Sequence, residues 1–280
     1  MAVPESQAAR VKMPVSQVAT AAYGAVFGRL GLLLELAWLP LLILLAVELV
    51  PGLVADYLWP TSPASAPGRL DVAELVETVA ALLCLNAFAV RWYQATLSRG
   101  QRAPPRRLFV AAWVRFVGYG LVLYVPIMAP MTALSLWGKS SVGDEAMQLL
   151  TTAVAAVLIV ALLAVARVSL VFPAVAYGAP TSLLAAWRQM RGNTWRLIAA
   201  TLLVGAPVFI IVSLMLSGIL GAANLKLDQL PQPPPLGLSL LSGVVEVVLN
   251  FLFIALGASI TAEFYRRIVL DAPNHGRRHR

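Results

Sequence analysis

The sequence has few of the residues with which proteins carry out chemistry. It contains a single cysteine, Cys84, and only two histidines, His275 and His279, both near the C-terminus. That count excludes a disulfide within the chain and the ligand spacing of a zinc site. The signature motifs of serine hydrolases, zinc proteases and phosphate-binding loops are absent. We therefore expect no enzymatic activity, no metal and no cofactor.

Charged residues are also scarce, whereas apolar residues are abundant. Charged residues make up 12% of the chain and hydrophobic residues 60%, while soluble domains contain about 25% charged residues. The mean hydropathy is +0.81. A soluble protein of 280 residues cannot hide this much apolar surface without a charged exterior. The composition therefore indicates an integral membrane protein.

Several apolar runs are long enough to cross a bilayer, which requires about 20 predominantly apolar residues. The six runs of this length are Leu30–Val50, Val72–Trp92, Ala111–Leu136, Met147–Phe172, Trp195–Gly221 and Gly237–Phe264. We therefore predict an all-α fold, a polytopic helical bundle with six transmembrane helices. Residues 30–264 are the predicted membrane domain, residues 1–29 an N-terminal segment, and residues 265–280 a basic tail. We interpret the first run as a retained span rather than a signal peptide.

The basic residues predict the orientation of these spans. Of 21 lysines and arginines, 18 lie in the two terminal segments, in the loops that follow the second and fourth runs, or within the ends of the runs beside those loops. The other three loops contain one each, Arg69, Lys139 and Lys226. Basic loops stay on the cytoplasmic side, so both termini are predicted to be cytoplasmic, in a bacterial inner membrane. The clustering of arginines beside apolar runs does not favour nucleic-acid binding.

Two segments are amphipathic and too short to span. Residues 182–191 place Leu183, Leu184, Trp187 and Met190 on one side, with Thr181 or Ser182 as the N-cap and Gly192 as the helix end. A similar stripe runs from Val15 to Val26. We predict short interfacial helices at the cytoplasmic headgroup level. The residues expected to contact headgroups or a partner protein are Trp187, Arg188, Arg191 and Arg196.

A weak internal repeat relates the odd-numbered spans. Each begins at an arginine, and a proline follows at the same distance, which predicts helix kinks at Pro40, Pro126 and Pro207. We interpret the pattern as three helical hairpins with the same orientation. The alternative is coincidence, because arginines at cytoplasmic ends and prolines in spans are both common. Repeats in one direction differ from the inverted repeats of many transporters.

The segment between the fourth and fifth runs resembles a known family. The residues that carry the resemblance are Arg167, Leu170, Pro173, Leu183, Ala186, Trp187, Arg188, Arg191, Gly192, Asn193, Trp195 and Arg196. They resemble a bacterial six-helix inner-membrane family, mostly uncharacterised, related to the membrane domain attached to some glycerophosphodiester phosphodiesterases. The resemblance implies the six-helix fold. It implies no activity, because the catalytic barrel of the fused proteins has no counterpart here.

Polar residues inside spans are candidate functional residues. Glu35 lies near the cytoplasmic end of the first run and is expected to pair with Arg91, Arg167 or Arg266; a proton or ligand site is the alternative. Glu246 and Asn250 share a face of the last run at spacing i,i+4 and, with Asn86, form a predicted buried polar cluster. That cluster is either a packing contact or a transport site.

The function that this pattern favours is a scaffold or assembly partner in the membrane, without enzymatic activity. The alternative is a carrier or permease for a lipid or another amphipathic small molecule, and an enzyme acting on lipid is the least favoured hypothesis. The expected partners are membrane lipid and other membrane proteins. The sequence indicates no particular oligomeric state.

Overall fold

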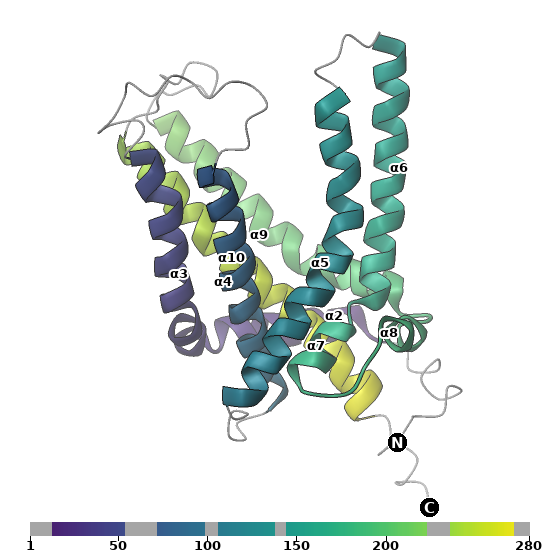
Figure 1. Cartoon of the computed structure of the whole chain (residues 1–280). Coiled ribbons are helices and arrows are strands. Elements are labelled where there is room, and N and C mark those ends of the chain that lie inside the picture. The colour runs from purple at the N-terminus through teal and green to yellow at the C-terminus, as the bar shows by residue number, and fades with distance from the viewer. Residues whose placement is uncertain (1–12, 54–71, 99–105, 138–143, 223–235, 272–280) are drawn as a thin grey trace, which may run out of the picture. The chain divides into compact units, whose positions relative to one another are not determined.

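A computed structural model describes residues 13–53, 72–98, 106–137, 144–222 and 236–271. These residues form helices joined by short turns, and the described part of the chain contains no strand (Figure 1). The predicted all-α class is confirmed. The proline-rich loops and most of the basic tail lie outside the described residues.

The long helices coincide with the apolar runs of the sequence. They are α3 (Leu30–Leu53), α4 (Val72–Leu97), α5 (Arg106–Trp137), α6 (Asp144–Val168), α9 (Thr194–Ala222) and α10 (Leu236–Tyr265). Each of the six is long and apolar enough to cross a membrane. The fold is therefore that of a multi-pass helical membrane protein, while the arrangement in three hairpins stays a prediction.

The fourth predicted span lies within an apolar segment long enough to cross a membrane, but its helix is broken near the C-terminal end. The run Met147–Phe172 was expected to be one helix, but α6 ends at Val168 and a separate helix, α7 (Val171–Ala176), follows. Pro173 explains the break, because it has no N–H to donate to the carbonyl of Ser169. That carbonyl accepts instead from the backbone N–H of Phe172, at 3.2 Å. Two further short helices are α2 (Val15–Phe27) and α8 (Leu183–Gln189).

The contacts divide the chain into two compact units. Unit 1 comprises residues 1–18, 93–199 and 261–280, and unit 2 comprises residues 19–92 and 200–260. The boundaries fall inside α2, α4, α9 and α10, so these helices contribute residues to both units. Each unit brings together segments that are far apart in the sequence.

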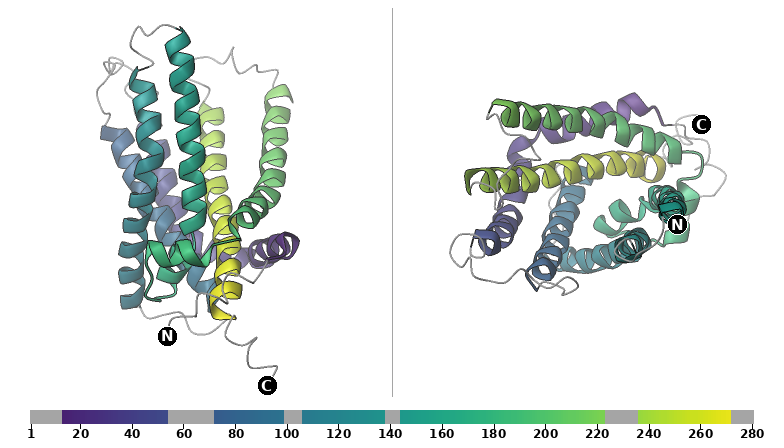
Figure 2. Two further views of the ribbon diagram at one scale, coloured as in Figure 1. Left: turned by 90° about the vertical axis from the view of Figure 1, so that its right-hand side faces the viewer. Right: turned by 90° about the horizontal axis from the view of Figure 1, so that it is seen from above.

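Unit 1 is built around α5. This helix packs against α6 and α7, and α6 packs against α8; α5 and α6 lie side by side in Figures 1 and 2. The centroid of the Phe116 ring on α5 lies 4.8 Å from the centroid of the Phe172 ring and 5.9 Å from that of the Tyr93 ring on α4. Leu170 and Val171 in the turn before and at the start of α7 are fully buried. The short helix α7 is therefore part of the core of unit 1.

Unit 2 has an aromatic core between α4 and α10. The centroid of the Phe88 ring lies 4.9 Å from that of the Phe251 ring, in an edge-to-face arrangement, and 6.0 Å from that of the Trp92 ring. All three side chains are fully buried. The indole N–H of Trp92 donates to Ser259 Oγ at 2.9 Å, which satisfies the one polar atom of this buried ring.

The predicted stripe on α2 is buried in the protein. Val18, Ala22 and Val26, spaced by four residues, have no measurable exposure. From the same helix, the Tyr23 hydroxyl donates to the carbonyl of Val204 on α9, at 2.8 Å. This carbonyl lies within one turn of Pro207, where a helix loses backbone donors. Helices α3, α5 and α9 all continue through their prolines, Pro40, Pro126 and Pro207.

Candidate functional site

Polar contacts in unit 1 concentrate where the N-terminal segment meets the start of α9. The backbone N–H of Met13 donates to Asn193 Oδ1 at 3.4 Å, and the Arg196 guanidinium donates to the Met13 carbonyl at 2.6 Å. Met13 and Asn193 are buried. Arg196 was predicted to contact lipid headgroups or a partner protein; in the structure its guanidinium donates to the backbone carbonyl of Met13.

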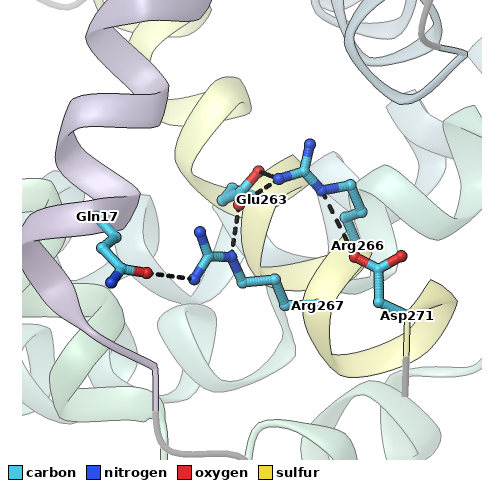
Figure 3. Close-up of polar contacts among 5 residues, drawn as sticks. All are labelled: Gln17, Glu263, Arg266, Arg267 and Asp271. Atoms are coloured by element: carbon cyan, nitrogen blue, oxygen red, sulfur yellow. Dashed lines mark hydrogen bonds and ion pairs between the residues drawn. The ribbon is translucent and has the colours of Figure 1, made fainter. Parts of the chain in front are cut away.

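A buried carboxylate organises the end of α10. The Glu263 side chain, 7% exposed, accepts hydrogen bonds from Arg266 and, at 2.6 Å, from Arg267 Nε. Arg267 also donates to Gln17 Oε1 on α2 at 3.0 Å. Figure 3 shows the four side chains together, with Asp271 beside Arg266. We call Glu263, Arg266, Arg267 and Gln17 the Glu263 cluster; it ties α10 to α2.

The backbone changes its winding at this cluster. Residues 266–270 form a turn of π-helix directly after α10. Such turns are rare and frequently mark functional positions. Here the spacing places Arg266 and Arg267 three and four residues after Glu263, so that both guanidinium groups reach one carboxylate.

Glu263 was not among the residues predicted from the sequence, although the sequence contains a signal for it. A glutamate followed at three and four residues by arginines, at the end of an apolar run, is a local ion-pair pattern. Arg266 was instead predicted as a partner of Glu35. In the structure its guanidinium pairs with Glu263, and its Nε lies 3.9 Å from Asp271 Oδ2.

Two further hydrogen bonds join α4 to other elements of unit 1. Gln94, which is buried, donates through Nε2 to the Ala176 carbonyl at the end of α7, at 3.1 Å. The hydroxyl of Tyr93 lies 2.6 Å from Thr261 Oγ1 on α10. A buried polar group without a partner is costly, so these contacts select one arrangement of α4, α7 and α10 in unit 1.

Helix α8 forms largely as the sequence indicates. Ser182 is its N-cap, and its side chain accepts from the Ala185 N–H at 3.2 Å. The helix ends before Gly192, whose φ of 85° suits glycine. Its apolar residues do not share one surface: Met190 is buried, whereas Leu184 is 59% exposed. The depth of α8 in a membrane interface stays a prediction.

Arg167 and Trp187 meet where α6 packs on α8. The guanidinium carbon of Arg167 lies 4.3 Å from the centroid of the Trp187 ring, a cation–π contact. The neighbouring Arg188 and Arg191 are exposed on the surface. Sequence reasoning named Arg167 and Trp187 separately, and only the structure brings them together.

The predicted polar residues of unit 2 lie mostly on its surface. The side chains of Glu35, Arg91, Glu246 and Asn250 are exposed, and the Asn86 amide donates to the Leu82 carbonyl of its own helix at 2.5 Å. The predicted cluster of Asn86 with Glu246 and Asn250 was expected to be buried, whereas Glu246 and Asn250 are exposed; the Glu35 ion pair stays a prediction. Among the described residues, no group of three histidine, cysteine, aspartate or glutamate side chains is placed to bind a metal.

Comparison with known proteins adds no relative to this description. No family model, no curated protein and no solved structure matches the chain. The resemblance to the six-helix inner-membrane family therefore stays a prediction, carried by the residues between Arg167 and Arg196.

Proposed function

We propose that this chain is a multi-pass protein of the bacterial inner membrane that acts as an assembly partner for other membrane proteins, without enzymatic activity of its own. The observation that carries the proposal is the exposed pair Glu246 and Asn250, which we call the α10 stripe. Both residues lie on one face of α10, four residues apart.

The α10 stripe belongs to a helix that is long and apolar enough to cross a membrane, which supports placing it at membrane depth. Ser259, bonded to Trp92, is level with the arginine-bearing end of α4 in unit 2. At 1.5 Å per residue, Asn250 is about 14 Å and Glu246 about 20 Å along α10 from that level. Both distances fall within a hydrocarbon core of about 30 Å.

An exposed carboxylate at that depth is unfavourable unless another polar or charged group pairs with it. An acidic side chain inside a bilayer costs roughly 2.5–3.5 kcal/mol on insertion scales, and such residues usually pair within a bundle or line a polar path. A transmembrane helix of a partner, bearing a basic or amide side chain, offsets this cost by hydrogen bonding. The charge of Glu246 therefore favours a partner helix with a basic or amide residue at matching depth.

Site-specific cross-linking tests the proposal. Phe253 shares the face of the α10 stripe, because it lies seven residues after Glu246, and its side chain is 38% exposed. A benzophenone-bearing phenylalanine analogue at position 253 should capture one membrane protein. The captured peptide should be a transmembrane segment with a basic or amide residue, and Glu246→Ala should reduce its yield at least about tenfold.

The matched control uses Phe209 on α9, which is 65% exposed. The same analogue at that position should capture lipid only. Lipid adducts at position 253 that disappear with Glu246→Ala would support the carrier instead, and a cross-link within the chain would contradict both functions.

The proposed orientation has a separate test. Reporters active only in the cytoplasm should be active when fused at Arg102, at Gln189 and at the C-terminus. Reporters active only in the periplasm should respond at Ser62, Ser141 and Gln232. The effect is all-or-none, because a span cannot place both ends on one side. A periplasmic C-terminus would show that the number of spans is odd.

A further inference from the structure

The cation–π pair of Arg167 and Trp187 in unit 1 leaves part of the guanidinium group available to bind a ligand. The guanidinium carbon of Arg167 lies over the Trp187 ring, 4.3 Å from its centroid. Stacking on a ring leaves the N–H groups in the guanidinium plane directed outward, where they can bind an anion in a bidentate manner. The pair therefore orients a positive group without neutralising it.

One donor of Arg167 has no acceptor. Its Nε is buried, and within the described part of the chain no atom accepts a hydrogen bond from it. Leaving a buried charged donor without an acceptor is costly, and the cost falls when a ligand oxygen supplies the bond. This atom is the observation that points to a ligand rather than to packing alone.

The surroundings favour a ligand with both an anionic and an apolar part. Leu184, three residues before Trp187, is 59% exposed, and Trp187 itself is 36% exposed. Arg191, in the turn that follows the end of α8 at Gln189, adds an exposed positive charge. Free phosphate leaves the apolar side chains uncovered, whereas acyl chains cover them.

The site is held in place from several directions. The hydroxyl of Tyr119 on α5 donates to the carbonyl of Thr181, at 3.4 Å, just before the N-cap of α8. Ser182 caps α8, and α6 packs against α8. Trp187 is thus presented to Arg167 by a helix whose start is fixed, so the arginine is preorganised before a ligand arrives.

We propose that Arg167, oriented by Trp187, binds the phosphodiester of an anionic phospholipid, with Arg191 as a second positive charge and Leu184 beside the acyl chains. The phosphate oxygens accept from the guanidinium, and a shift of the Arg167 side chain lets the buried Nε reach one of them. This site is independent of the α10 stripe, so it can exist whether or not the chain is an assembly partner.

Lipid binding to the purified full-length protein tests the proposal. Native mass spectrometry in detergent measures the retained lipid at increasing concentrations of phosphatidylglycerol, phosphatidylcholine or inorganic phosphate. We expect retention of phosphatidylglycerol and about tenfold weaker binding of phosphatidylcholine. Arg167→Lys should weaken phosphatidylglycerol binding about tenfold, because lysine keeps the charge but lacks the planar fork and Nε.

Two further variants separate binding from folding. Trp187→Phe keeps an aromatic face and should weaken binding two- to fivefold, while Arg115→Lys, at an exposed arginine of α5, should leave it unchanged. Only folded protein retains lipid in this measurement, so the affinity refers to the folded fraction. Equal affinity of the wild type and Arg167→Lys, or displacement of the lipid by inorganic phosphate at equal concentration, would overturn the proposal.

Discussion

Glu263→Gln should lower the stability of the protein in detergent by about 3 kcal/mol, because breaking a buried ion pair leaves charges without a partner. The carboxylate is 7% exposed and accepts from two arginines, Arg266 and Arg267. A neutral amide can accept one of these hydrogen bonds but does not compensate two guanidinium charges. The measurement is thermal unfolding followed by the intrinsic fluorescence of the tryptophans.

Glu77→Gln is the control for this prediction. Glu77 is an exposed glutamate on α4, so the same chemical change there should shift the unfolding midpoint little. Arg267→Gln should have a smaller effect than Glu263→Gln, because Arg266 still neutralises the carboxylate. Equal midpoints of Glu263→Gln and Glu77→Gln would show that the Glu263 cluster contributes nothing to stability.

Trp92→Ala is expected to have the second large effect, a loss of about 4 kcal/mol. The side chain has no measurable exposure, lies beside Phe88 and donates to Ser259 Oγ. Its removal opens a cavity next to α10 that the surrounding helices fill only in part. In a membrane, helices are held together mainly by such packing, because lipid itself is apolar. The readout is again the thermal unfolding midpoint in detergent.

Trp195→Ala provides the comparison, because Trp195 is 71% exposed and its removal opens no cavity. Its effect should be well under that of Trp92→Ala. Ser259→Ala should cost about 1 kcal/mol, the usual value of one hydrogen bond. A loss after Trp92→Ala no larger than that after Trp195→Ala would contradict the packing shown between α4 and α10.

The proposed sites differ in how far the sequence anticipated them. Arg167, Trp187, Glu246 and Asn250 were all candidates, because charged and aromatic residues within or beside apolar runs are rare and readily noticed. Their partners were not predictable. Nothing in the pattern indicates that Arg167 lies over Trp187, since the residues are twenty positions apart and separated by α7.

The sequence by itself determined which segments form the six long helices but not all of their ends, since α4 ends at Leu97 rather than Trp92 and α5 begins at Arg106 rather than Ala111. The length and hydropathy of each span match the thickness of a bilayer, and a cap such as Ser182 affects only the first turn of its own helix. Both features are local, so they can be recognised in the sequence without knowledge of the tertiary structure. The break between α6 and α7 also has a local cause, Pro173, but a hydropathy pattern does not detect it because proline does not interrupt the apolar run.

Only the tertiary structure decided which polar groups meet. Arg196 bonds to Met13 and Arg267 to Gln17, pairs separated by more than 180 residues. Such contacts depend on how distant helix ends pack and on which carbonyl or carboxylate lies within reach. The energy of a hydrogen bond or ion pair falls off within a few ångströms, so these pairs cannot be predicted from composition or from spacing along the chain.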